Sequence, residues 1–465
     1  MTKAASVNQA YLEDASGLVG HAGSVFVPKD EAGVAEVLRR AGREGIGVTV
    51  AGAGTGLVGG RVPRGGWVLS TEALNQLKIF PGYAVAGAGV TLKNLHAAAA
   101  ATKQFYAPDP TETASYIGGN IATNASGSRS FRYGATRQHV LALRVVLASG
   151  EILHVRRGQA VDFPVAAISI PHTTKHSAGY PLRPGMDWVD LFVGSEGTLG
   201  VVTEAELRLL PMAKEILAGV VFFASDEDAL NAVDRWRAEA SPRMIEYFDR
   251  PSLGILRTGF PEIPADAGAA LLIEQELKGD DDPETGRWVE RLERDHALLN
   301  DSWFGTSSAD RDRFRAFRHA LPDLVNDRLR QNGNLKLASD CAVPLERGRE
   351  MLGFYRRRLE ETFPGKYVIF GHIGDAHLHV NILPAKAEGD RAMAVLMEFA
   401  REAVSLGGTV SAEHGLGKRK TPLLEIQFSA EEIEAMKAVK RRLDPMGILG
   451  RGTLWCEEAG AKTKS

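Results

Sequence analysis

The segment Ala51-Gly-Ala-Gly-Thr-Gly-Leu-Val-Gly-Gly60 contains five glycines in ten residues, and it follows Gly47–Val50, an apolar stretch typical of a β-strand. Neighbouring glycines permit positive φ angles, which turn backbone N–H groups inward toward an anionic phosphate. The segment is not a GxGxxG motif that opens a helix, because Val62 and Pro63 end any helix at once, and no GK[ST] triplet of a P-loop follows. Taken alone, it predicts either a phosphate-binding loop or a structural loop.

Two further clusters of glycine and small residues favour the binding interpretation. The first extends from Pro108-Asp-Pro110 through Ile117-Gly-Gly-Asn-Ile-Ala-Thr-Asn-Ala-Ser-Gly127 to Arg132-Tyr-Gly-Ala-Thr-Arg137, and the second is Gly194-Ser-Glu-Gly-Thr-Leu-Gly-Val-Val-Thr203. Small residues let the backbone approach a ligand closely, while Asn120, Thr123 and Asn124 offer hydrogen bonds to it.

Histidines gather in the C-terminal part of the chain. Four of the twelve fall between residues 372 and 414, in Phe370-Gly-His-Ile-Gly-Asp-Ala-His-Leu-His-Val-Asn381 and Gly407-Gly-Thr-Val-Ser-Ala-Glu-His-Gly-Leu-Gly-Lys418. Imidazole nitrogens with a carboxylate suit Zn²⁺, and also Mn²⁺, Fe²⁺ or Co²⁺. His377 and His379 lie two residues apart, so in a strand they share a face and form a candidate pair of ligands. A lone buried histidine is usually a core residue, but two such segments favour a metal site. The spacing does not decide which histidines bind.

In their order along the chain, the glycine segments resemble the flavin-contacting segments of the FAD-binding fold shared by vanillyl-alcohol-oxidase-like flavoproteins. The resemblance covers nearly the whole chain. No histidine occurs between His21 and His96, where some members attach FAD covalently, so a non-covalent flavin is expected. The family's Asn-Pro-Gly-Lys run after Leu-Asp-Pro is replaced here by Gly450-Arg-Gly-Thr453, so one asparagine contact is missing. The positions that match the family's FAD contacts are Gly52, Gly54, Thr55, Gly56, Gly59, Pro108, Asp109, Gly118, Gly119, Asn124, Glu196, Gly197 and Val202.

The histidine segments resemble the metal-binding motif of FAD-linked D-2-hydroxyacid dehydrogenases, whose members act on D-lactate, glycolate or D-2-hydroxyglutarate. The resemblance implies that His372, His379 and Glu413 hold a divalent metal, with Zn²⁺ or Mn²⁺ favoured, and it leaves His377 outside the ligand set. It makes His414 the catalytic base and Asn381 a substrate contact. Because Glu413 and His414 are adjacent, a turn at Gly415 is needed to direct both at one substrate.

The expected substrate is a carboxylate, and Arg318 matches the family arginine that pairs with it, since arginine offers bidentate geometry. Lys336, the candidate for a second carboxylate, is displaced by two residues from the lysine of D-2-hydroxyglutarate enzymes. Pro322 replaces a threonine found there. Both departures favour a monocarboxylate such as D-lactate. The implied reaction has the metal chelating the substrate oxygens, His414 taking the hydroxyl proton, and the C2 hydride passing to FAD.

The resemblance and the residue patterns together predict an α+β fold in three parts: a two-part FAD-binding domain (1–211), an α/β cap domain with a largely antiparallel sheet and the metal site (212–425), and a C-terminal helical segment that returns to the FAD-binding domain (426–465). Strands are predicted at 48–50, 67–69, 83–86, 143–147, 191–193, 220–223 and 269–276. Helices are predicted at 31–44, 92–101, 225–240, 282–300, 309–329, 345–363, 390–406 and 429–443.

Composition limits the other classes of function. A net charge of -3 provides no overall attraction for nucleic acid, and two separate cysteines, Cys341 and Cys456, exclude a Cys-ligated iron–sulfur cluster. With no basic signal and no long apolar run, a cytoplasmic protein is expected, with peripheral membrane contact left open. A homodimer is also left open.

The sequence does not name the electron acceptor, so an external quinone, cytochrome, electron-transfer flavoprotein or iron–sulfur subunit is expected. Two alternatives compete with the dehydrogenase. A non-catalytic subunit of a glycolate-oxidase-like complex keeps the glycine loops and loses the metal motif, and a flavoenzyme for a sugar or phenol lacks the His/Glu residues.

Overall fold

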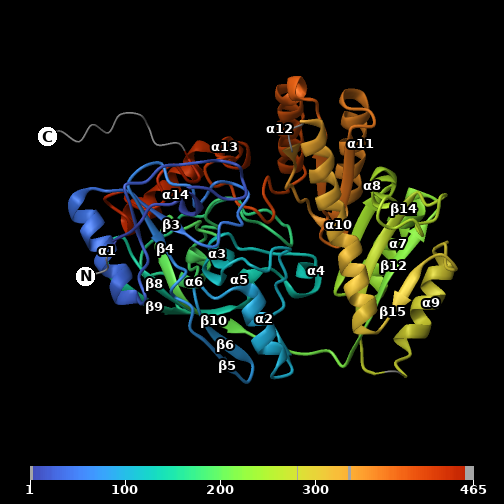
Figure 1. Ribbon diagram of the computed structural model, residues 1–465, viewed down its shortest axis with the longest axis horizontal. Coiled ribbons are helices and arrows are strands. Elements are labelled where there is room, and N and C mark those ends of the chain that lie inside the picture. The colour runs from blue at the N-terminus through green and yellow to red at the C-terminus, as the bar shows by residue number, and fades with distance from the viewer. Residues whose placement is uncertain (1–3, 280, 334–336, 456–465) are drawn as a thin grey trace.

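Two lobes make up the molecule, a computed structural model that describes residues 4–279, 281–333 and 337–455 (Figure 1). One lobe combines the N-terminal part of the chain with the C-terminal helices α13 (Pro422–Gln427) and α14 (Ala430–Leu443). The other lobe contains β12 (Glu215–Phe223) through α12 (Gly389–Ser405). Among the described residues, no helix is both long enough and apolar enough to cross a membrane.

The first lobe is built on two sheets. In the four-stranded sheet, parallel strands pair side by side and one short antiparallel strand covers an edge; its order is β1 (Ala4–Ala5), β2 (Ser24–Phe26), β4 (Trp67–Ser70) and β3 (Val48–Ala51). The five-stranded sheet is antiparallel, in the order β5 (Leu77–Phe80), β6 (Tyr83–Gly87), β10 (Val201–Arg208), β8 (Val140–Val146) and β9 (Ile152–Arg156). A two-stranded ribbon joins β7 (Gln104–Phe105) to β11 (Leu210–Pro211).

Helix α1 (Glu31–Glu44) has the bounds that the sequence predicts, because Asp30 caps its N-terminus and Gly45 ends it in the left-handed conformation. The predicted strand at 191–193 is wrong. Leu191 and Phe192 belong to the short helix α6 (Trp188–Phe192), and Val193 is its C-cap residue. Every side chain of this helix is buried, and Asp187 accepts a hydrogen bond from the backbone of Asp190. A short apolar run has no periodicity that separates a buried strand from a buried helix. The other helices of this lobe are α2 (Leu92–Ala100), α3 (Ile117–Ala122), α4 (Ser130–Tyr133) and α5 (Thr136–His139), with a 3₁₀ turn at Gln9–Tyr11.

The second lobe contains one seven-stranded antiparallel sheet, which confirms the expected α+β class. Its order is β15 (Trp303–Gly305), β12, β14 (Ala269–Leu277), β13 (Met244–Asp249), β17 (Tyr367–His372), β18 (His377–Ile382) and β16 (Leu337–Ala338). Helices cover both faces of this sheet: α7 (Asp226–Glu239), α8 (Arg250–Leu256), α9 (Glu284–Arg294), α10 (Ser308–Asn332), α11 (Gly348–Thr362) and α12. Short 3₁₀ turns lie at Leu345–Arg347, Ile373–Asp375 and Lys386–Glu388.

Successive side chains of β12 point to opposite faces of this sheet and pack against different helices. Val220 and Phe222 of β12 belong to a core with Phe317 of α10, whereas Val221 packs in the other core with Trp236 of α7. Because successive residues of a strand point to opposite faces, a strand buried on both sides reads as a continuous apolar run. This is why β12 and β14 could be predicted from the sequence while their pairing could not.

The C-terminal segment returns to the first lobe, beside α1 and β3 (Figure 1). Val48 of β3 donates its backbone N–H to Ile448 at 2.6 Å, and Gly450 donates to Val48 at 3.0 Å. Asp444, which is buried, holds this turn by accepting from the backbone of Ile448 (3.0 Å) and Leu449 (2.8 Å). Residues near the C-terminal end of the chain therefore form backbone hydrogen bonds with β3, the edge strand of the four-stranded sheet.

Asp444→Ala should destabilise the first lobe by roughly 2–4 kcal/mol, because two buried N–H groups lose their acceptor. Urea unfolding followed by tryptophan fluorescence measures the change. Glu434→Ala is the control, since Glu434 lies on α14, the helix that Asp444 caps, with a side chain that is 56% exposed. It should change stability by no more than about 0.5 kcal/mol. Equal losses in the two variants would contradict this account of the C-terminal turn.

Candidate active site

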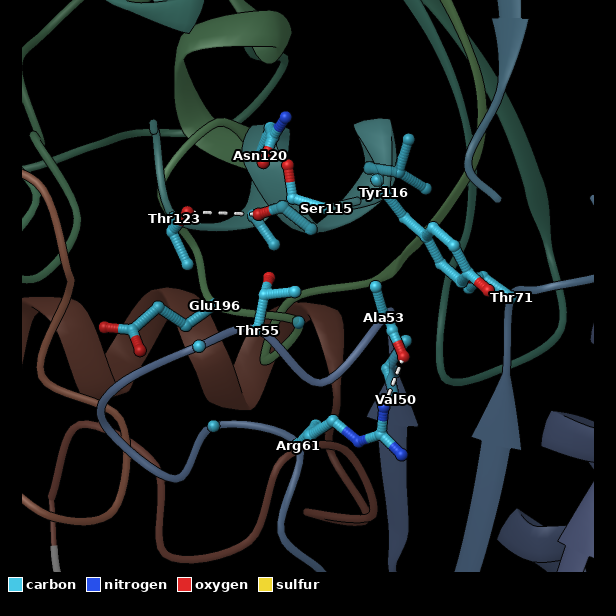
Figure 2. A pocket seen from close by; sticks show the side chains of 18 of the residues that line it. Val50, Ala53, Thr55, Arg61, Thr71, Ser115, Tyr116, Asn120, Thr123 and Glu196 are labelled. Atoms are coloured by element: carbon cyan, nitrogen blue, oxygen red, sulfur yellow. Dashed lines mark hydrogen bonds between the residues drawn. The ribbon is translucent and has the colours of Figure 1, made fainter. Parts of the chain in front are cut away.

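A cavity of about 1000 Å³ opens between the glycine segments of the first lobe. Figure 2 shows Thr55 facing Asn120 and Ser115 across it, with Glu196 at one end and Tyr116 at the other. The Arg61 guanidinium donates to the carbonyl oxygen of Gly52 at 2.7 Å and so holds the first glycine loop. Nine of the thirteen expected FAD contacts line this cavity: Gly52, Gly54, Thr55, Gly56, Gly118, Gly119, Glu196, Gly197 and Val202.

The walls of this cavity leave room for a dinucleotide. A Cβ atom added to Gly119 or Gly60 meets no atom within 4 Å, so a larger residue at either position would project into open space. The lining also includes backbone-rich loops and few charged groups. The arrangement therefore fits a long ligand whose phosphates bind to backbone N–H groups.

Four of the expected FAD contacts do not line this cavity: Gly59, Pro108, Asp109 and Asn124. Asn124 is used within the protein, since its amide donates to the carbonyl of His176 (3.0 Å) and accepts from the backbone of Arg137 (2.9 Å). Asp109 pairs with Arg129 at 3.0 Å and borders a second cavity of about 770 Å³. Residues that the sequence did not single out, Arg61, Ser115, Tyr116 and Ser195, line the main cavity instead.

The hairpin of β17 and β18 places three histidines on one face. His372 pairs directly with His377 across the hairpin, and His379 follows two residues later on the same side. The ring centroids of His377 and His379 are 4.6 Å apart, and those of His372 and His379 are 5.2 Å apart. Gly371 is required beside them, because its φ is +117° and a Cβ there would lie 2.8 Å from the ring of His379.

Glu413 completes a cluster of potential metal ligands. One ligand atom from each of His372, His377, His379 and Glu413 lies within 4.8 Å of the others. The three residues expected as ligands are thus together, and His377 lies with them. Burial and the neighbouring histidines hold the pKa of His379 well below its ordinary value, so its ring is neutral. Neutral imidazoles and a carboxylate are the donors that Zn²⁺ or Mn²⁺ accepts, so the residues fit a divalent metal.

A buried lysine lies against the cluster. Lys175 is fully buried, and its ammonium lies 2.8 Å from Oε1 of Glu413 and 3.1 Å from Oδ2 of Asp375. Ser126 donates to the same Glu413 oxygen at 3.1 Å. Although burial alone would raise it, the pKa of Glu413 is held well below its ordinary value by Lys175 and His372. The carboxylate is therefore ionised and oriented.

Carboxylates also lie behind two of the histidines. Glu246, a buried residue of β13, lies 2.5 Å from Nδ1 of His372 and accepts from Nε of Arg318 at 2.8 Å. Asp340 lies 3.2 Å from Nε2 of His377. A carboxylate behind a ligating imidazole fixes the orientation and tautomer of the ring. Glu246 is one of two acids in β13, and the sequence did not single it out.

The remaining expected residues are distributed around this cluster. His414 lines the main cavity, and its ring stacks on that of His379 with centroids 6.0 Å apart. Arg318 borders the second cavity, and Asn381 lies buried in β18. Lys336 lies outside the described residues.

Glu196 connects the cavity to the segment that follows His414. Its two oxygens accept the backbone N–H groups of Leu416 (2.9 Å) and Gly417 (2.8 Å), and burial raises its pKa to about 7. The expected turn at Gly415 is present, with a φ of +74° and the Glu196 carboxylate 2.8 Å from where a Cβ would lie. Lys418 donates from its ammonium to the carbonyl of Gly60 at 2.7 Å.

Comparisons with known proteins agree with this arrangement. Residues 212–454 match the model of the C-terminal domain of FAD linked oxidases, and residues 22–156 match that of the FAD binding domain, which confirms FAD as the expected cofactor. The chain is 32% identical to D-lactate dehydrogenase of Archaeoglobus fulgidus (92% of this chain, 90% of that protein) and 32% identical to glycolate oxidase subunit GlcD of Bacillus subtilis (94% and 89%). It is 30% identical to D-2-hydroxyglutarate dehydrogenase of Xanthomonas citri pv. viticola (93% and 89%).

A solved structure of alkyldihydroxyacetonephosphate synthase superposes on 93% of this chain and 76% of that one, with a TM-score of 0.68 and 16% identity. At this identity the likeness concerns the fold, and it confirms the expected vanillyl-alcohol-oxidase type.

Glu196→Gln should loosen the segment 413–419, because an amide nitrogen cannot accept from a backbone N–H. One of the two N–H groups then loses its partner, which costs about 1–3 kcal/mol. Hydrogen exchange of this segment should accelerate about tenfold or more, measured by mass spectrometry on the FAD-loaded protein. Glu204→Gln serves as the control, since Glu204 lies on β10 away from the segment, and it should leave the exchange of residues 413–419 unchanged.

Proposed function

The chain belongs to the FAD-linked oxidases, and from this premise we propose that it is an FAD-dependent dehydrogenase that oxidises D-lactate to the 2-oxo acid. One observation carries the proposal. His414 borders the cavity assigned to FAD and also stacks on His379 of the metal-ligand cluster. A single residue is thus in reach of both the flavin and a metal-bound substrate, as proton removal coupled to hydride transfer requires.

FAD, held without a covalent bond among the glycine segments, supplies the acceptor for the C2 hydride. A divalent metal held by His372, His379 and Glu413 supplies Lewis acidity toward the substrate's 2-hydroxyl and carboxylate oxygens. His377 lies close enough to be a fourth ligand. The protein's own part is to orient these donors, and Glu246, Lys175 and Ser126 do this through the contacts described above.

His414 acts as the general base. Its Nδ1 lies 3.2 Å from Asp340, which leaves Nε2 available to take the hydroxyl proton of the substrate. The side chain is 26% exposed, so the ring remains accessible from the cavity. Asn381 is the proposed polar contact to the substrate.

Arg318 is the proposed partner of the substrate carboxylate. Its Nε already donates to Glu246 and one η nitrogen lies 3.3 Å from the hydroxyl of Thr111, but guanidinium has five N–H donors. The remaining donors can pair with an oxygen of a small anion. The displaced Lys336 and the proline at position 322 support a monocarboxylate, so D-lactate is preferred to D-2-hydroxyglutarate.

The names of the relatives support a D-2-hydroxy acid as substrate, and they divide among lactate, glycolate and 2-hydroxyglutarate. A non-catalytic subunit is the second candidate, because one relative is a subunit of glycolate oxidase. The metal-ligand cluster favours the dehydrogenase. Electrons would pass from the flavin to an external acceptor such as a quinone or an electron-transfer flavoprotein.

Turnover on a panel of 2-hydroxy acids, coupled to a redox dye, tests the substrate. D-lactate should react well above D-2-hydroxyglutarate, because one carboxylate partner and no aligned lysine suit a short monocarboxylate. It should also react well above L-lactate, a preference that rests on the resemblance to D-2-hydroxyacid dehydrogenases. A chelator should abolish turnover and leave the flavin absorbance unchanged. Equal rates with both enantiomers of lactate would contradict the proposal, and inactivity on the whole panel would favour the non-catalytic subunit.

Substitutions should separate the metal from the base. His372→Ala, His379→Ala and Glu413→Ala should each lose bound metal and activity while retaining FAD, because none of the three side chains lines the flavin cavity. His414→Ala should retain metal and FAD but lose about 10²–10⁴-fold in kcat, the usual contribution of a positioned general base. Metal analysis and flavin absorbance of each variant give the readout. Should His377 prove essential for metal and His372 dispensable, the pair of ligands on one strand is the correct assignment.

A further inference from the structure

Asp340 lies between the metal-ligand cluster and the proposed base. It follows β16, and its side chain is fully buried. Oδ1 lies 3.2 Å from Nε2 of His377. Oδ2 lies 3.2 Å from Nδ1 of His414, and it accepts hydrogen bonds from the His414 backbone (3.0 Å) and the Ser411 hydroxyl (2.7 Å). One carboxylate therefore contacts two histidines of the site, a different oxygen to each.

We propose that Asp340 is a positioning residue shared by the metal centre and the base: Oδ1 orients His377 as a fourth metal ligand, and Oδ2 orients His414 toward the flavin cavity. The part that concerns His414 rests on the proposed function. The part that concerns His377 requires only that the cluster binds a metal. Neither role follows from the glycine segments or from the assignment of His372, His379 and Glu413.

The geometry of His377 supports its role as a ligand. Nε2 of His377 lies 3.2 Å from Oδ1 of Asp340, and its other nitrogen, Nδ1, lies 3.9 Å from Oε1 of Glu413. Neither ring nitrogen has a hydrogen-bond partner among the described residues, so either is available to a ligand. His372 is held in the same manner, with Glu246 behind Nδ1 and Nε2 3.4 Å from Glu413. A carboxylate on the far side of an imidazole keeps the proton on that side and leaves the inner nitrogen's lone pair for the metal. Each of the two opposed histidines of the hairpin thus has a carboxylate on its outer side, at 2.5 Å from His372 and at 3.2 Å from His377.

The contacts of His414 support its role as an oriented base. Asp340 contacts both the backbone and the ring of this residue, so its main-chain position and its χ angles are held by one group. A proton on Nδ1, directed at the carboxylate, leaves Nε2 as the proton acceptor. Ser411 also donates to Oδ2, which fixes the carboxylate itself. Movement of Asp340 would therefore disturb the base and one metal ligand together.

A purely structural role is the competing explanation, because the carbonyl of Asp340 also accepts from the backbone of Ala412 at 2.7 Å. That contact involves the main chain and survives replacement of the side chain. A structural role predicts lower stability alone. A positioning role predicts lower affinity for metal and slower turnover, each dependent on a different histidine.

The test is Asp340→Asn, which preserves shape and removes the charge. Zn²⁺ affinity, measured on the FAD-loaded protein by competition with a chromophoric chelator, should fall about 10–100-fold, the usual effect of losing a carboxylate behind a metal ligand. Dye-coupled kcat should fall by a similar factor. Asp295→Asn is the matched control: Asp295 is equally buried in the second lobe and pairs with Trp236 and Arg235. It should lower stability but leave Zn²⁺ affinity within about twofold.

Double variants separate the two arms. In a His377→Ala background, Asp340→Asn should cause no further loss of Zn²⁺ affinity. In a His414→Ala background, it should cause no further loss of kcat, because residues that act as a unit are not additive. The proposal is overturned if Asp340→Asn leaves both quantities within about twofold of wild type, or if its effects persist unchanged in the two backgrounds.

A measurement on the wild type covers the case in which Asp340→Asn does not fold. Long-range ¹⁵N–¹H spectra of histidine-labelled holoprotein should find the ring proton of His377 on Nε2 and that of His414 on Nδ1. The opposite tautomers, or a wild type that binds no Zn²⁺, would overturn the corresponding arm. The Zn²⁺ affinity and the histidine tautomers are measured without substrate. If the protein oxidised none of the hydroxy acids, the proposed function would be contradicted, but these two measurements would still test the role of Asp340.

Discussion

A single carboxylate oxygen, Oε1 of Glu413, lies within contact distance of both lobes. Lys175 (2.8 Å) and Ser126 (3.1 Å) reach it from the first lobe, and His372 (3.4 Å) reaches it from the hairpin of the second. A buried charge is costly unless it is paired and hydrogen-bonded, so each of these groups has a defined place relative to the others. The contacts of this carboxylate therefore tie the hairpin to the first lobe.

The charges near this point explain why a cation suits the cluster. Four carboxylates, Asp340, Asp375, Glu246 and Glu413, lie on or directly behind it, whereas Lys175 and Arg318 provide the cations that contact them. With His377 and His379 kept neutral by burial, the surroundings carry an excess of negative charge. A divalent metal bound by the cluster would offset this excess, and an anionic substrate would then meet less repulsion near Arg318.

Much of this arrangement could be predicted from the sequence because it is local. Helix α1 has its caps within the segment, and the histidines of β18 share a face through the period of a strand. The partners behind the ligands could not be predicted. Lys175 meets Glu413 across 238 residues, and Glu246 meets His372 across 126, with no motif around either residue. The helix at 188–192 was missed for a different reason, since a short buried run carries no periodicity.

The segment from Glu413 to Arg419 connects the metal-ligand cluster to the flavin cavity within seven residues. At its start, Glu413 faces the histidine cluster, and His414, the proposed base, follows immediately. At its end, the backbone N–H groups of Lys418 and Arg419 donate to the carbonyl of Val58 in the first glycine loop at 2.9 and 3.0 Å. Glu196 holds the middle through two backbone N–H groups. The distance between the base and the flavin cavity is consequently set by the same short stretch of backbone that carries a metal ligand. The proposed proton removal and hydride transfer would need substrate, base and flavin in one fixed geometry, and this stretch, held at both ends, would fix the place of the base within it.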